Sequence, residues 1–187
     1  AMYNDGTAST AGHVRLYDWD ASASTWVQVG ADIDGEAGGD LSGVSVSLSS
    51  DGTRVAIGAY GNDGTASGAG HVRLYDWNDS AWVQVGADID GEAERDSSGY
   101  SVALSGDGSR VAIGAYNNDG TATNAGHVRL YDWNDSAWVQ VGADIDGEAE
   151  FDNSGRSVSL SSDGLRVAIG AHNNDGTATN AGHVRLY

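Results

Sequence analysis

The chain has 187 residues, 28 of them glycine, and contains neither proline nor cysteine. Its 27 acidic residues outnumber 9 basic ones, which gives a formal net charge of -18. The lack of cysteine excludes disulfides, thiolate metal sites and cysteine nucleophiles. The charge argues against nucleic acid and anionic membranes as partners, because phosphate contacts need clustered basic residues. No apolar run is long enough to cross a bilayer, and we expect no signal peptide in this chain.

An internal repeat organises the whole chain. The hexapeptide Gly-His-Val-Arg-Leu-Tyr occurs four times, and its copies begin at positions 12, 70, 126 and 182. Residues 82–131 and 138–187 are identical at 43 of 50 positions, as a direct comparison of the two segments shows. Copies this similar must share one structure, and they indicate recent duplication or design.

One repeat predicts four short strands, because apolar side chains alternate with polar or small ones between turn residues. In one copy we expect strand A at 99–105, strand B at 110–115, strand C at 127–133 and strand D at 138–145. Asp-Gly pairs and short polar segments supply the turns between them. No stretch has the apolar period of a helix, so we expect no helix.

Successive connections of an antiparallel meander lie at alternate ends of the strands. The long loops from B to C and from D to the next A therefore share one end, and this end carries most of the acidic residues. We call it the long-loop face. The short A-to-B and C-to-D turns share the opposite face.

Four-stranded antiparallel units that recur about every 56 residues are typical of β-propeller blades. A parallel β-helix is the weaker alternative, because its coils are usually shorter and lack paired hairpins. We therefore predict an all-β propeller with three blades per chain and one extra strand, a duplicate strand C. The expected units are a partial blade at 1–41 (strands C and D), repeats at 42–97 and 98–153, and a partial blade at 154–187 (strands A, B and C).

Three segments of one repeat together resemble the FG-GAP repeat of integrin α-subunit propellers and their microbial and algal relatives. They are Ser98–Ser105, Val111–Tyr116 and Gly126–Tyr131. The Trp-x-Gln-x-Gly segment from Trp138 to Gly142 resembles the variant of this repeat in secreted and cell-surface proteins. The resemblance extends over nearly the whole chain. It implies a propeller fold and an extracellular or cell-surface location.

The chain departs from this family at its defining motifs. The family's Phe-Gly is Ser-Gly here, and its Gly-Ala-Pro is Gly-Ala-Tyr or Gly-Ala-His. The family's calcium loop lies between strands A and B, where these repeats have one aspartate each, Asp51, Asp107 and Asp163. Calcium takes roughly 6 to 8 oxygen ligands, so the resemblance does not carry that site over.

The acidic runs at the end of strand D are the candidate calcium ligands. Alternate carboxylates at a strand end point the same way, and Ca²⁺ prefers oxygen donors. The residues are Asp32, Asp34 and Glu36; Asp88, Asp90 and Glu92; and Asp144, Asp146 and Glu148. A solvated acidic loop explains the same runs, and the sequence implies no other cofactor.

The repeated cationic residues are interpreted as structural. His13, His71, His127 and His183 share one position in strand C, so as ligands they would lie on separate blades. The arginines of strands B and C have many acidic neighbours, and we expect ion pairs between blades. A clamp for a carboxylate ligand is the alternative for these arginines.

The repeats differ mainly in the D-to-A loop and just after it, for example at Val44, Tyr100 and Arg156. Loops on a rigid scaffold are common binding sites, although neutral drift at exposed positions explains the differences equally well. The candidate ligand residues of the long-loop face are Tyr60, Tyr100, Tyr116, Arg156 and His172. Exposed rings at these positions could stack on sugars.

Two functions remain open, and neither is catalytic. Every candidate catalytic group recurs in the same context, and no nucleophile–base pair is unique, so we expect no enzyme. The unpaired strand edges at both ends favour a structural or assembly module that closes a ring by homo-oligomerisation, with strands A, B and C of one chain pairing with strand D of the next. A dimer would have six blades and is favoured over a trimer of nine. The alternative is a recognition or adhesion module that binds protein or carbohydrate through the long-loop face.

Overall fold

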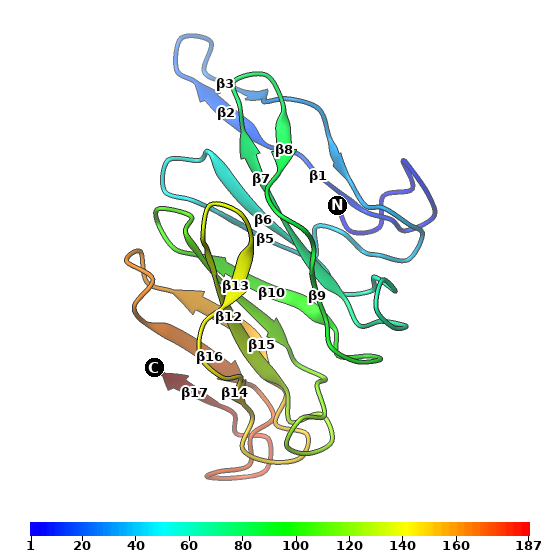
Figure 1. Ribbon diagram of the computed structural model, residues 1–187, viewed down its shortest axis with the longest axis vertical. Helices are drawn as coiled ribbons and strands as arrows, with labels where there is room; N and C mark the ends of the chain where they lie inside the picture. The colour runs from blue at the N-terminus through cyan, green and yellow to red at the C-terminus, as the bar shows by residue number, and fades with distance from the viewer.

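The computed structural model describes all 187 residues, and all of its regular elements are β-strands (Figure 1). The chain therefore has no helix that is long and apolar enough to cross a membrane. The strands form several small antiparallel sheets that follow one another along the chain. The prediction of an all-β, propeller-like fold is confirmed.

The strands fall into four consecutive units. The first unit contains β1 (His13–Val14), β2 (Tyr17–Asp20), β3 (Thr25–Gln28) and β4 (Ile33–Asp34). The second contains β5 (Ser45–Leu48), β6 (Arg54–Ala59), β7 (His71–Trp77), β8 (Trp82–Gln84) and β9 (Ile89–Asp90). The third contains β10 (Ser98–Leu104), β11 (Arg110–Ala115), β12 (His127–Trp133), β13 (Trp138–Gln140) and β14 (Ile145–Asp146). The fourth contains β15 (Ser154–Leu160), β16 (Val167–Ala171) and β17 (His183–Leu186).

The strand order within each complete unit is the predicted meander. In the third unit the order is β10-β11-β12-β13, and every pairing is antiparallel. The expected continuous strand D at 138–145 is wrong, because it is divided into β13 and β14, which both pair with β12. Gly142 has a φ of 74°, and a left-handed residue interrupts an extended strand. Gly30 and Gly86 make the same break in the other copies.

Adjacent units stack face to face and bury an apolar cluster between them. Between the second and third units, Ala56, Val72 and Leu74 of β6 and β7 pack with Val102 and Leu104 of β10. An equivalent cluster lies between the third and fourth units. The alternating apolar residues of the sequence therefore supply the contacts that join one unit to the next.

Candidate functional site

The five candidate ligand residues of the long-loop face come from three consecutive units and form a chain of neighbours. The ring of Tyr100 lies 5.4 Å from that of Tyr60 and 4.6 Å from that of Tyr116, both with edge-on geometry. The Arg156 guanidinium lies 4.7 Å from the Tyr100 ring centre and 4.8 Å from the Tyr116 ring centre. His172 lines a hollow of about 500 Å³ beside Arg156. We call these residues the tyrosine–arginine row.

Arg156 is the residue of this row whose guanidinium N–H groups have no hydrogen-bond acceptor. It is half-buried against the two tyrosine rings, yet it forms no ion pair and its guanidinium makes no hydrogen bond. Burial, and then the charge of Arg156, lower the pKa of His172. The row thus combines aromatic surface with free N–H donors, a set that suits a ligand with a planar or apolar face and a carboxylate.

The candidate calcium runs do not converge on one point. In the middle run, the Asp88 carboxylate lies beside His71 of its own unit, whereas Glu92 pairs with Arg129 of the next unit. Between them, Asp90 accepts a hydrogen bond from Arg129 through its backbone oxygen. The other runs are divided in the same way, with Asp32 beside His13, Glu36 on Arg73, Asp144 beside His127, Glu148 on Arg185, and the backbone oxygens of Asp34 and Asp146 bonded by Arg73 and Arg185.

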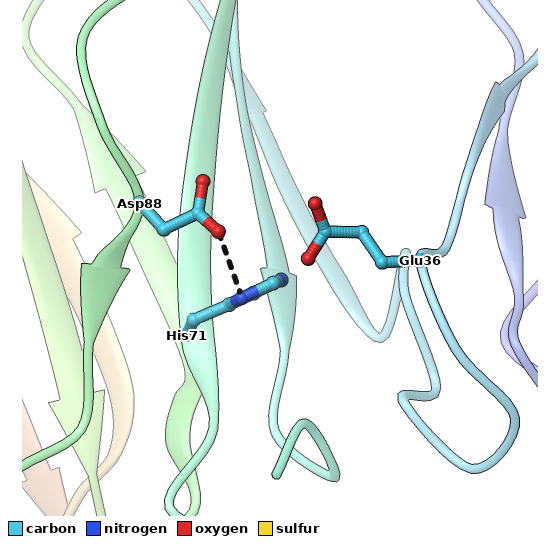
Figure 2. A group of neighbouring side chains, drawn as sticks. All are labelled: Glu36, His71 and Asp88. Atoms are coloured by element: carbon cyan, nitrogen blue, oxygen red, sulfur yellow. Dashed lines mark ion pairs between the residues drawn. The ribbon is translucent and has the colours of Figure 1, made fainter. Parts of the chain in front are cut away.

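The structure instead joins carboxylates from two units to one histidine. Glu36, His71 and Asp88 place one oxygen or nitrogen atom each within 4.8 Å of the others (Figure 2). The corresponding residues Glu92, His127 and Asp144 form the same group one repeat later. We call these groups the inter-unit clusters. Burial, and then the neighbouring arginine, lower the pKa of both histidines, which favours neutral rings near pH 7.

The histidines are therefore on separate units, as expected, but each has carboxylate neighbours that the sequence analysis missed. Glu36 and His71 are distant in sequence and meet only because adjacent units pack together. The sequence does contain a constant spacing between the acidic run of one repeat and the histidine in strand C of the next. This spacing predicts a contact only if it is already known which faces of the two units pack together.

Three of the four arginines of strand C make the expected ion pairs between units, whereas Arg15 pairs with Asp32 of its own unit. The pairs are Arg73–Glu36, Arg129–Glu92 and Arg185–Glu148, with N–O distances of 3.3, 3.4 and 3.5 Å. The arginines of strand B differ, because Arg54 binds both oxygens of Asp76 within its own unit at 2.6 and 2.7 Å. Arg54 reaches the next unit through a third hydrogen bond, to the Gly108 oxygen at 3.0 Å.

Part of the chain matches a known repeat family. Residues 87–131, which include β9 to β11 and most of β12, match the model of the FG-GAP repeat. This segment is similar to one FG-GAP repeat. The resemblance drawn from the sequence is thereby confirmed for this segment.

The fold also matches solved structures. A Bacteroides uniformis protein provisionally assigned as a 6-phosphogluconolactonase superposes on 95% of this chain with a TM-score of 0.62 and 11% identity. The match covers 44% of that protein, so this chain spans less than half of its length. A hydrazine synthase from Kuenenia stuttgartiensis matches 67% of this chain and 28% of its own, with 14% identity and a TM-score of 0.43. At 11% identity the first match shows the fold alone. No curated protein sequence matches the chain.

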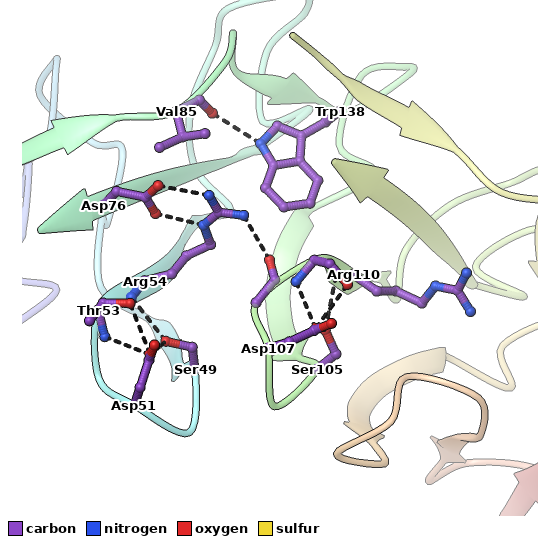
Figure 3. Close-up of polar contacts among 12 residues, drawn as sticks. Ser49, Asp51, Thr53, Arg54, Asp76, Val85, Ser105, Asp107, Arg110 and Trp138 are labelled. Carbon is purple, nitrogen blue, oxygen red and sulfur yellow. Dashed lines mark hydrogen bonds and ion pairs between the residues drawn. The ribbon is translucent and has the colours of Figure 1, made fainter. Parts of the chain in front are cut away.

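The A-to-B turn of each complete unit uses its aspartate to close the turn itself. The Asp51 carboxylate accepts hydrogen bonds from the Ser49 hydroxyl at 2.6 Å and from the backbone N–H and hydroxyl of Thr53 at 3.0 and 2.9 Å (Figure 3). Ser105, Asp107 and Ser109 repeat this arrangement. In both turns one oxygen of the aspartate accepts all of these hydrogen bonds.

Asp51 is expected to stabilise the fold at neutral pH and to lose this effect in acid. Its hydrogen bonds, that from the Ser49 hydroxyl first, lower the pKa of the carboxyl from 3.8 to about 2. Because the folded pKa lies below the unfolded one, the stabilisation is complete above about pH 4 and disappears as the pH falls through about 2. Asp51→Asn should therefore lower the thermal unfolding midpoint at pH 7 by a few degrees and change little at pH 2.

Circular dichroism melts of both proteins across this pH range measure the effect. Asp79→Asn is the control, because Asp79 is an exposed turn residue whose carboxylate makes no hydrogen bond. A loss of stability that is equal at pH 2 and pH 7 would contradict the assignment.

Proposed function

We propose that this chain is a non-enzymatic propeller module that closes a ring with a second copy of itself. The observation that carries the proposal is an exposed copy of the buried interface between units. Val102 and Leu104 of β10 are 8% and 7% exposed, because the second unit covers them. The equivalent residues of β5, Val46 and Leu48, are 53% and 52% exposed.

A hollow lined mainly by apolar side chains lies beside β5, where strands A and B of a complete unit would pack. It has a volume of about 720 Å³ and lies between Leu16 and Trp26 of the first unit and Val46 and Leu48 of β5. In the complete interface one repeat later, β6 and β7 both contribute to the corresponding cluster. The first unit contains strands C and D, and in the proposed ring its strands A and B are supplied by another copy.

The fourth unit supplies a hairpin of the required sequence. β15 and β16 are strands A and B of a unit, and nothing in this chain covers their outer face. Ala168 is half-exposed there, whereas the equivalent Ala56 and Ala112 are fully buried. In the proposed ring, β15 and β16 of one copy enter the hollow beside β5 of the next.

The polar residues of the hairpin are also incomplete within one chain. Arg54 binds Asp76 of its own unit and the carbonyl oxygen of Gly108 in the next unit (Figure 3). Arg110 makes the equivalent bonds to Asp132 and to the Gly164 oxygen. Arg166, the equivalent residue, is exposed and makes no ion pair. The matching aspartate is Asp18 in β2 of a second copy, so β1 and β2 of that copy take the place of β17 as strand C.

A dimer is the expected assembly, and its mass tests the proposal. Because this chain spans 44% of the matched lactonase-like structure, two copies come to about the length of that one chain. Native mass spectrometry should give twice the chain mass of 19.2 kDa. A folded monomer at micromolar concentration would overturn ring closure, and a trimer would correct the blade number from six to nine.

The second candidate is recognition of a carboxylate-bearing ligand, a sugar acid or an acidic peptide, by the tyrosine–arginine row. Its specific support is Arg156, an arginine held between two rings with no acidic partner. Arg156→Gln and Tyr116→Ala should each weaken binding by about tenfold or more in a glycan and peptide array screen. Arg95→Gln is the matched control, because Arg95 is an exposed arginine of the same face. A blank array, or equal binding by all variants, would leave the assembly function alone.

A further inference from the structure

The inter-unit clusters contain buried imidazoles without hydrogen bonds. His71 and His127 are each 1% exposed, and their Nε2 atoms have no partner. Their Nδ1 atoms lie 3.6 Å from an oxygen of Asp88 and Asp144, which is too far for a hydrogen bond. Buried polar groups in proteins are nearly always hydrogen-bonded. Neither nitrogen atom of either ring therefore has a hydrogen-bond partner.

A glutamine side chain orients the aspartate of each cluster through a hydrogen bond. Gln84 donates a hydrogen bond of 2.6 Å to one oxygen of Asp88, and the other oxygen faces His71. Gln140 holds Asp144 with the same geometry, also at 2.6 Å. Carboxylates that ligate metals are commonly fixed in this way by an outer hydrogen bond.

The third member of each cluster comes from the preceding unit and reaches solvent. In Figure 2 the Glu36 carboxylate extends toward His71 from the opposite side to Asp88. One of its oxygens lies 3.3 Å from Arg73, so the second oxygen remains available. The Glu36 side chain is 47% exposed, which gives an ion a route into the cluster.

We propose that each inter-unit cluster binds one divalent transition-metal ion of the zinc type. The donors are one imidazole nitrogen and two carboxylate oxygens, a set that suits Zn²⁺ or Co²⁺ better than Ca²⁺, which prefers oxygen alone. Water completes the coordination on the exposed side. The two carboxylates supply two negative charges to the ion, and the glutamate shares its charge with the neighbouring arginine. Bound metal joins one unit to the next.

Ring closure would create a third site at the junction between copies, and this part alone rests on the proposed function. His13 and Asp32 already lie together in the first unit, with 3.7 Å between Nδ1 and the carboxylate. They lack the glutamate of a preceding unit, and Arg15 folds back onto Asp32 instead. In the dimer, Glu148 of the other copy takes that place.

Titration of metal-free protein with Zn²⁺ in a calorimeter, and with Co²⁺ followed by visible absorption, tests the proposal. We expect two ions per chain if the protein is a monomer. We expect three ions per chain in the closed ring. Glu92→Gln should remove one site, and Glu36→Gln combined with Glu92→Gln should remove both internal sites. These glutamates are half-exposed, so the variants should fold. Glu150→Gln is the control, at an exposed glutamate outside the clusters.

The outcomes separate the two proposals. Two ions per chain in a monomeric protein would support the metal sites and overturn ring closure. A dimer that takes up no Co²⁺, or whose uptake is unchanged in the double glutamate variant, would overturn the metal sites and leave ring closure standing. Binding that is weakened equally by Glu150→Gln would show diffuse attraction to the acidic surface, which also overturns them.

Discussion

Replacing Gly114 with alanine is expected to lower the free energy of unfolding by about 3 kcal/mol, because backbone of the next unit occupies the position of the new methyl group. A Cβ atom on Gly114 would lie 2.0 Å from the backbone oxygen of Gly155. At the equivalent Gly58, it would lie 1.9 Å from the oxygen of Gly99. A backbone oxygen cannot rotate away, so the two units must separate. A loss of this size lowers the unfolding midpoint of a domain of this length by roughly 10 °C.

The fourth unit provides the matched control. Gly170 has the same position in β16, but within one chain a Cβ atom there meets only Ser157, with the hydroxyl at 2.4 Å and the backbone oxygen at 3.8 Å. A serine hydroxyl can change rotamer, so Gly170→Ala should cost the isolated chain little. Urea unfolding of the three proteins at low concentration measures the difference. Equal losses in both variants would show that the close approach between units is not the cause.

The strands and their order could be predicted because their information is local. Val102 and Leu104 alternate with small residues, and Asp-Gly turns separate the strands, so the meander follows from each repeat alone. The break in strand D could not be predicted in the same way. Gly142 continues the apparent alternation of its segment, and only its positive φ shows that the strand is interrupted there.

The candidate sites depended on packing between repeats, which the sequence pattern does not contain. The variable positions placed Tyr100 and Arg156 on one face, but their contact requires β15 to pack beside β10. The acidic runs failed to form a common site for a related reason. β9 ends at Asp90, so the alternation that would place Asp88 and Glu92 on one side does not extend to Glu92. That residue follows the loop to the next unit.

Gly170→Ala should convert the proposed dimer into a folded monomer, because ring closure brings Gly170 against Gly43 of the second copy. Gly43 is the strand A glycine equivalent to Gly99 and Gly155, whose oxygens lie against Gly58 and Gly114. The hydroxyls of Ser45 and Ser101 donate to those two oxygens at 2.8 and 2.7 Å. Ser157, their equivalent, is exposed and has no such acceptor in its own chain.

The expected change is about 10,000-fold in the dimer dissociation constant, since a clash of about 3 kcal/mol now falls on association, and not on folding, at each of the two junctions of the ring. Light scattering over a concentration series measures it, and circular dichroism at each concentration confirms that the variant is folded. Ser157→Ala removes one hydrogen bond at each junction and should weaken the dimer only by about 30-fold. If Gly170→Ala dimerises as tightly as the parent chain, the two copies meet through another surface. The exposed residues of β5 and β16 would then need a different partner.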